Sequence, residues 1–115
     1  PSSAAKAISL KELGSIKLDK EETKKTLKTI PRSSIIGFIV GVLPGAGSTI
    51  ASFLAYGMER NFVNKEEKEK FGKGSVHGLS APETANNAAC SGSFVPLLTL
   101  GLPGSGTTAV MLGAL

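Results

Sequence analysis

The sequence is poor in the side chains that carry most metal, redox and hydrolytic chemistry. It holds one cysteine, Cys90, one histidine, His77, and no tryptophan. A single cysteine excludes a disulfide within the chain, and a single histidine excludes a histidine-based metal cluster. The nucleotide-binding patterns GxxxxGK[ST] and GxGxxG and the hydrolase pattern GxSxG are missing as well. Nothing in the sequence therefore supports metal binding, phosphate binding or hydrolysis.

Charge is absent from two long stretches of the chain. No charged residue lies between Ser33 and Met58, or from Thr84 to the end, and every Lys and Arg falls between Lys6 and Lys73. The mean hydropathy of +0.13 therefore averages polar segments with strongly apolar ones. The first uncharged stretch is longer than the roughly 20 residues of a spanning helix. We expect a membrane protein, and because the chain ends inside an apolar run, a piece of a longer one.

Composition divides the chain into four parts. The excess of basic over acidic side chains near the N-terminus is typical of the cytoplasmic side of a membrane. Acidic residues lie among the lysines there, and aromatic residues lie mainly in the apolar segments, so we expect no nucleic-acid partner. The parts are a polar basic loop with an amphipathic helix (1–32), a broken membrane segment or re-entrant hairpin (33–58), a polar loop with a short helix (59–80), and an Asn-Asn segment with a second, truncated broken membrane segment (81–115).

One short motif occurs twice, each time in the middle of an uncharged stretch. The copies are Leu43–Thr49, LPGAGST, and Leu102–Thr108, LPGSGTT. Proline removes a backbone donor and glycine favours non-helical angles, so neither copy can continue a regular helix. Within hydrocarbon, broken backbone is tolerated only where protein buries it or a wet cavity receives it. The motif therefore predicts a polar site at membrane depth, as in secondary transporters.

The first motif divides its apolar stretch into two short arms, Ser33–Leu43 and Ser48–Met58. Each arm would reach roughly 16 Å, about half the hydrocarbon thickness. Two arrangements fit: a re-entrant hairpin with its tip at mid-membrane, or one crossing helix interrupted in the middle. Charged, mildly basic segments flank both ends, which slightly favours the hairpin.

Capping patterns predict the helices of the polar parts. Asp19 with Glu22 predicts a helix from about Lys20 to Thr29 that ends before Pro31, and we favour a solvated position for it over a membrane surface. Asn64 with Glu67 predicts a short exposed helix closed by glycine. We place Pro82 and Glu83 in the first turn of a further helix, and we expect Pro96 and the second motif to interrupt the final apolar stretch. His77 is expected at a surface or interface.

The two motifs and the Asn86-Asn87 pair are the candidate site. Backbone amides freed at a helix N-terminus attract a carboxylate, whereas free carbonyls and hydroxyls suit a sodium ion. Carboxamides can coordinate a cation and also donate to a carboxylate, and they are costly at membrane depth unless satisfied. The alternatives are purely structural roles: glycine-rich kinks that serve only packing, and asparagines that only cap helices or hydrogen-bond between them. A role of Glu83 in ion binding is a weaker hypothesis.

Five segments in this order resemble the large membrane subunit of the tripartite tricarboxylate transporters, the TctA family. They are Pro31–Ser33, Gly41–Gly47, Phe71–Gly74, Ala81–Ala88 and Pro96–Gly104. Leu102 departs from the isoleucine expected there, which is a conservative change. The resemblance implies a multi-pass permease of the bacterial inner membrane, built from two related halves, of which this chain is the core of the second. It also implies a small membrane subunit and a periplasmic solute-binding protein as partners, and uptake driven by an ion gradient, usually of sodium.

We therefore expect an all-α integral membrane protein with broken or re-entrant helices, part of an inverted-repeat secondary transporter. It would be a symport permease for carboxylates, with residues 1–32 cytoplasmic, and neither an enzyme nor the holder of a cofactor. The alternative is a membrane-embedded scaffold subunit without its own substrate site. The expected substrate- and ion-binding residues are Pro44, Gly45, Ala46, Gly47, Ser48, Thr49, Asn86, Asn87, Pro103, Gly104, Ser105, Gly106, Thr107 and Thr108.

Overall fold

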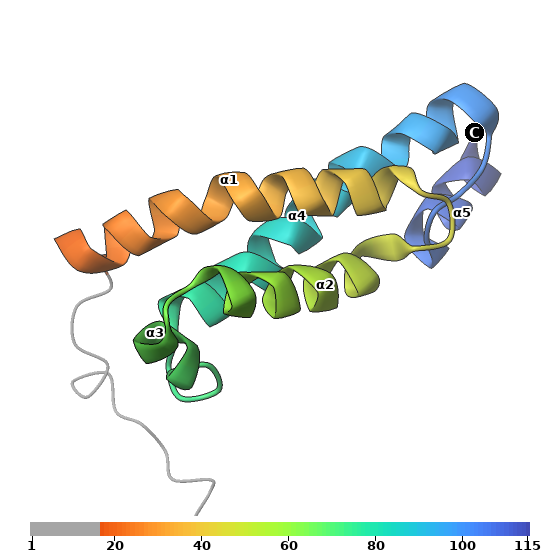
Figure 1. Cartoon of the computed structure of the whole chain (residues 1–115). Coiled ribbons are helices and arrows are strands. Elements are labelled where there is room, and N and C mark those ends of the chain that lie inside the picture. The colour runs from red at the N-terminus through yellow and green to blue at the C-terminus, as the bar shows by residue number, and fades with distance from the viewer. Residues whose placement is uncertain (1–16) are drawn as a thin grey trace, which may run out of the picture.

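The fold is known from a computed structural model that describes residues 17–115. All the regular secondary structure in this part of the chain is helical, as the sequence predicts (Figure 1). Three long helices lie side by side and two shorter elements sit at opposite ends of them. The helices are α1 (Lys20–Val42), α2 (Gly47–Phe62), α3 (Lys65–Glu69), α4 (Val76–Leu100) and α5 (Gly106–Ala114).

α1 and α2 form an antiparallel helical hairpin, and α4 runs alongside it, parallel to α1 (Figure 1). The start of α1 meets the end of α2, because Thr29 Oγ1 donates to Glu59 Oε1 at 2.9 Å. Of the two arrangements left open for residues 33–58, the structure has the hairpin. Its arms are longer than the sequence indicated, since each helix continues into the polar flank. The depth of its tip in a membrane stays a prediction.

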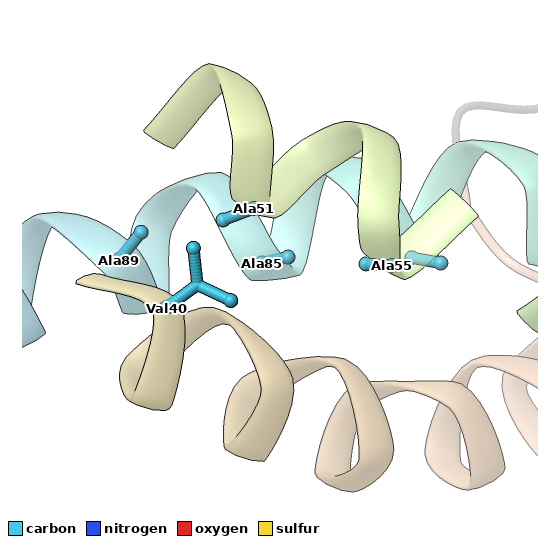
Figure 2. Close-up of a cluster of buried hydrophobic side chains, with 6 residues drawn as sticks. Val40, Ala51, Ala55, Ala85 and Ala89 are labelled. Atoms are coloured by element: carbon cyan, nitrogen blue, oxygen red, sulfur yellow. The ribbon is translucent and has the colours of Figure 1, made fainter. Parts of the chain in front are cut away.

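Small residues repeat every fourth position on the faces where the three helices meet. Figure 2 shows alanines of α2 and α4 packed around Val40 of α1. No side chain larger than valine belongs to this apolar core, so the helix axes can approach closely, as in membrane bundles. The repeats are Thr29, Ser33, Gly37 and Gly41 on α1, Ala51 and Ala55 on α2, and Ala81, Ala85 and Ala89 on α4.

The closest approach is between α1 and α4, at two glycines of a GxxxG spacing. A Cβ on Gly37 would lie 2.6 Å from Ala85 Cα, and a Cβ on Gly41 would lie 2.7 Å from Ala89 Cα. These distances are far shorter than van der Waals contact, so only glycine allows the observed separation. Gly92 of α4 makes a third such approach, against the backbone of α1.

A buried polar cluster joins the three helices at the end of the hairpin opposite its tip. Glu59 is 1% exposed, and both its carboxylate oxygens accept from the Arg32 guanidinium. His77, on α4, is 5% exposed, with Nδ1 lying 2.7 Å from Thr29 Oγ1 and 3.2 Å from Glu59 Oε1. Of the surface or interface position expected for His77, the surface is wrong, and the residue lies where three helices meet. It is buried because Glu59 and Thr29 satisfy its ring nitrogen.

The contacts of this cluster are all satisfied by one arrangement of protons. Thr29 Oγ1 donates its single proton to Glu59. A proton on Nδ1 of His77 is then shared between Thr29 Oγ1 and Glu59 Oε1. The carboxylate thus accepts from a guanidinium, a hydroxyl and an imidazole, so its burial is compensated.

α3 is tied to α1 by an ion pair outside the small-residue core. Lys25 Nζ lies 3.0 Å from Glu67 Oε1. The hydrogen bond from Lys25 is the main cause that lowers the pKa of Glu67, and the same bond raises the pKa of Lys25. The Asn64 side chain accepts from the Glu67 amide at 2.9 Å, so the predicted cap of this helix is confirmed.

Three proline predictions are wrong, and the predicted Asp19 cap is confirmed. The Glu22 amide donates to Asp19 Oδ1 at 2.7 Å, but α1 continues through Pro31 to Val42. α4 begins at Val76, with Ser75 as its cap, so Pro82 and Glu83 lie beyond its first turn, and Pro96 lies inside it. A proline removes one backbone hydrogen bond from a helix. Burial on both sides of these prolines outweighs that loss.

Large apolar side chains are exposed on the outer faces of all three long helices. Among residues 17–115, no helix is both long enough and apolar enough for a complete membrane span. The exposed large apolar residues of α1 and α2 are Leu27, Ile30, Ile35, Phe38, Ile39, Ile50, Phe53, Leu54, Met58 and Phe62.

Candidate substrate and ion site

The first Pro-Gly motif forms the tip of the α1–α2 hairpin. α1 ends at Val42 and α2 begins at Gly47, while Gly45 and Gly47 have φ of +88° and +74°. These left-handed angles explain the two glycines, because a side chain is strained there. Ala46 precedes α2, and no side chain accepts from its first amides. The N-terminus of α2 therefore keeps free donors in its first turn.

The second motif turns the chain from α4 into α5. Gly101 ends α4 with φ of +66°, and its amide donates to the Leu97 carbonyl at 3.1 Å. Ser105 then caps α5: the Thr108 amide donates to Ser105 Oγ at 3.2 Å, and the Ser105 amide donates to Thr108 Oγ1 at 3.0 Å. The amides at this second helix start are therefore partly satisfied by the motif's own hydroxyls, unlike those of α2.

The two motifs meet, although they are offset by 59 positions in the sequence. A Cβ on Gly47 would lie 3.6 Å from the Gly104 carbonyl oxygen. A Cβ on Gly104, which is buried, would lie 3.7 Å from the Gly41 carbonyl oxygen. Figure 1 shows both turns at the same end of the bundle. The C-terminal end of α1 and the N-terminal ends of α2 and α5 thus converge there, while α4 continues past this point to Leu100.

Asn86 faces α2 across a groove that leads toward the first tip. The groove holds about 430 Å³ and is lined by Thr49, Ser52, Phe53, Tyr56, Pro82 and Asn86. Thr49 and Asn86, both expected site residues, therefore line opposite walls of the same groove. Ser52 Oγ lies 3.3 Å from the Pro82 carbonyl oxygen and so joins the two walls.

Asn87 lies one position along α4, so it faces a different direction from Asn86. Its Nδ2 donates to the Glu83 carbonyl oxygen at 2.9 Å, which leaves its amide oxygen available. Glu83 and both asparagines are exposed. The structure therefore brings Thr49 and Asn86 together in one groove, and Asn87 does not line that groove.

The remaining expected residues differ in exposure. Pro44, Gly45, Gly106 and Thr107 are exposed, whereas Ala46, Gly47, Ser48, Pro103 and Ser105 are half-buried, and Thr108 is buried within its capping box. The hydroxyls of Thr108 and Ser105 are engaged with each other, so Thr107 is the hydroxyl of the second motif that remains exposed. No group of histidine, cysteine and acidic side chains suited to a metal ion is found in residues 17–115.

Sequence reasoning missed the part played by Ser52 and Tyr56 in the groove. Both stand on the face of α2 that also carries Thr49, at helical spacing of three and four residues. That spacing was visible in the sequence. What was missing was the position of α4 opposite them.

Comparison with known proteins identifies the family. The family model described as "Tripartite tricarboxylate transporter TctA family" matches residues 2–115. This chain belongs to the TctA family. The assignment agrees with the resemblance carried by the five motifs.

Two curated relatives of this TctA chain come from Agrobacterium vitis. One is an uncharacterized 52.8 kDa protein in the TAR-I ttuC' 3'region, 41% identical over 93% of this chain and 21% of its own length. The other is an uncharacterized protein in the TAR-II ttuC' 3'region, 49% identical over 68% of this chain and 31% of its own length. The chain thus spans less than a third of each relative. No solved structure matches it.

Proposed function

We propose that this TctA chain is the substrate- and ion-binding core of a permease subunit that takes up tricarboxylates or related carboxylates. The subunit lies in the bacterial inner membrane and receives its substrate from a periplasmic binding protein, with a small membrane subunit as second partner. An ion gradient, of sodium, drives uptake, and no covalent chemistry occurs. Membership of the family and the meeting of the two Pro-Gly tips support this proposal.

The meeting of Gly47 with Gly104 is the observation that carries the proposal. It turns two separate helix breaks into one place where helix dipoles of both signs converge. The uncapped first turn of α2 offers donors to a carboxylate group. Asn86 and Thr49 line the approach to that turn and can donate to a second carboxylate of the same substrate.

The coupling ion would bind at the same tips, on the side of the carbonyl groups. α1 ends there without a basic side chain in its last turn, so its C-terminal carbonyls are not neutralised by one. Free carbonyls at such ends coordinate sodium in transporters with broken helices. The hydroxyl of Thr107 and the amide oxygen of Asn87 are further oxygen atoms that could coordinate the ion.

Radiolabelled uptake by cells that express the full-length permease with both partner subunits tests the function. The panel holds citrate and smaller di- and tricarboxylates, with and without a sodium gradient. We expect gradient-dependent uptake of at least one member. Asn86→Ala should lower uptake strongly, because Asn86 shares its groove with Thr49, whereas Asn61→Ala, at an exposed asparagine of α2 far from the tip, should not.

The same assay separates the proposal from its alternative. Loss of uptake in Asn86→Ala with normal membrane insertion supports a binding site at the tips. Uptake unchanged in Asn86→Ala, Asn87→Ala and the double variant would contradict the site. No uptake of any panel member from a correctly inserted complex would favour the scaffold subunit instead.

A further inference from the structure

The outer face of α1 changes chemistry once along its length. Lys20, Lys24 and Lys28 recur every fourth residue and are all exposed. The same face continues at helical spacing through Pro31 into Ile35 and Phe38, which are 62% and 44% exposed. Between positions 28 and 31 the lysines end and the face becomes apolar. Leu18 and Leu27, 57% and 65% exposed, are the large apolar side chains that lie among the lysines.

The protein itself does not use the charges of these three lysines. No hydrogen bond or ion pair joins them to any residue in 17–115. Asp19 caps α1, and Glu21 and Glu67 both lie against Lys25, on another face. Glu22, on the same turn, is half-buried. The folded chain thus leaves these three lysines as an unpaired cationic stripe.

α2 has the same change of chemistry at the same height. The Thr29–Glu59 hydrogen bond sets the register of the two arms, so Arg60 lies level with Lys28. Arg60 is exposed, and from it toward the tip the exposed large side chains of α2 are apolar, with Phe53 at 75% and Leu54 at 47%. Two helices therefore mark one common boundary across the bundle.

A protein partner would not require both helices to change from cationic to apolar at the same level. If water surrounded the whole face, its large apolar side chains would be exposed to solvent without a reason. A phospholipid leaflet has both chemistries in this order, phosphate at its surface and hydrocarbon below. Lysine stems can also lie along the apolar zone while their amines reach the phosphates. Clusters of basic residues beside a membrane segment bind anionic lipid for this reason.

We propose that Lys20, Lys24 and Lys28 bind the anionic headgroups of the leaflet, with the hydrocarbon boundary at Pro31 and Arg60. This replaces the solvated position that the sequence alone favoured for the first turns of α1. The inference rests on the membrane placement in the proposed function, but not on transport. The segment from Pro31 to the tip then reaches roughly 18 Å below the boundary, about half of the hydrocarbon thickness.

Spin-label accessibility tests the boundary in the full-length permease, reconstituted with its small subunit in phosphatidylcholine–phosphatidylglycerol nanodiscs. Single cysteines replace Lys24, Lys28, Pro31, Ile35, Phe38 and Ile39 in a cysteine-free background that carries Cys90→Ala, and each bears a nitroxide. Collisions with oxygen report hydrocarbon, and collisions with a water-soluble nickel complex report water. We expect nickel accessibility to be high at 24 and 28 and low from 35 onward, while oxygen accessibility rises.

Two results would overturn the inference. High nickel accessibility at every position would place this face in a water-filled cavity. Low accessibility to both probes throughout would mean that protein covers it. Neither result depends on uptake, so a permease that fails to transport could still show the boundary, and one that transports could lack it.

The charge of the stripe is tested by the lipid dependence of stability. The unfolding midpoint of the wild-type complex should rise when phosphatidylglycerol is added to phosphatidylcholine nanodiscs. The variant Lys20→Gln/Lys24→Gln/Lys28→Gln should lose most of this rise, and Lys20→Arg/Lys24→Arg/Lys28→Arg should keep it. An equal rise in the glutamine variant would show that these lysines do not bind the headgroups.

Discussion

Two glycines of α1 set how closely α1 and α4 pack. A Cβ on Gly41 would meet the Ala89 backbone, so Gly41→Ala forces α1 and α4 apart. We expect a loss of about 1–3 kcal/mol in the free energy of unfolding, the usual cost of overpacking. The measurement is thermal unfolding of the full-length permease in nanodiscs. Gly57→Ala is the matched control, because nothing lies within 4 Å of its Cβ position; an equal loss in both variants would contradict the explanation.

Glu59 is the residue whose role was least visible in the sequence. It looked like the first charge of a polar loop, yet it lies inside the bundle with Arg32, Thr29 and His77 around it. Single residues gave no signal of this, because the four groups come from three helices, two from α1 and one each from α2 and α4. Gly45 and Gly47 differ in this respect, because the left-handed angles that they adopt are a local requirement of the turn and could be predicted.

Removal of the Glu59 carboxylate should destabilise the bundle. Glu59→Ala leaves the Arg32 guanidinium and the His77 ring without their acceptor, and a broken buried pair costs about 3 kcal/mol or more. Thermal unfolding of the full-length permease would measure the loss. Glu69→Ala, at an exposed glutamate of α3, should change the unfolding midpoint little. If the two variants behaved alike, the cluster would not hold the hairpin to α4.

Among the elements, the starts of α1 and α3 were predictable, whereas the start of α4 and the interiors of α1 and α4 were not. Asp19 and Asn64 cap their helices through side chains three residues from their partners, so the signal is local. The proline predictions were wrong because the backbone hydrogen bond lost at each proline is outweighed by the burial of its neighbours. That burial exists only in the packed bundle. Pro31 stands between the buried Thr29 and Ser33, and the packing of these two against α4 holds the helix together across it.

The attachment of α3 to α1 should depend on pH. The pKa of Glu67 is lowered from its ordinary value of 4.5, so the Lys25–Glu67 bond stabilises the folded state above that value. Its contribution is lost as the pH falls through the lowered pKa. The raised pKa of Lys25 means that the bond persists until the pH exceeds 10.5. A nitroxide at Lys68 should become more mobile below pH 4.5, and Glu67→Gln, but not Glu66→Gln, should make it mobile at neutral pH.

A negative charge at the uncapped start of α2 should compete with the substrate. Ala46→Asp places a carboxylate beside the amides that the proposed function assigns to the ligand, and it should stabilise the helix by about 0.3–1 kcal/mol. We expect a raised KM for uptake, with Ala46→Asn as the neutral control of similar size. An unchanged KM in Ala46→Asp would mean that the substrate does not bind at this helix start.

At the scale of the whole molecule, the sequence predicted two breaks and the structure shows that they meet. The repeat of one motif indicated a shared purpose, but the contact between Gly47 and Gly104 depends on the length and direction of α4, which no local pattern reports. The placement of Asn86 opposite Thr49 likewise follows from the parallel course of α1 and α4. The candidate site is thus a property of three helices together.

The hairpin has a consequence for the topology of the complete permease. Lys28 and Arg60 lie at the same end of the bundle, since Thr29 and Glu59 are hydrogen-bonded, whereas a helix that crossed the membrane would separate them by its full thickness. Cysteines introduced singly at Lys28 and Arg60 should therefore react with a membrane-impermeant thiol reagent from the same side, the cytoplasmic one. Labelling in right-side-out and inside-out vesicles measures this. Val110→Cys, in α5, serves as a control for reagent leakage, because α5 lies at the opposite end of the bundle (Figure 1). Reaction of Lys28→Cys and Arg60→Cys from opposite sides would refute the hairpin in the membrane and would also separate the two tips that the proposed site brings together.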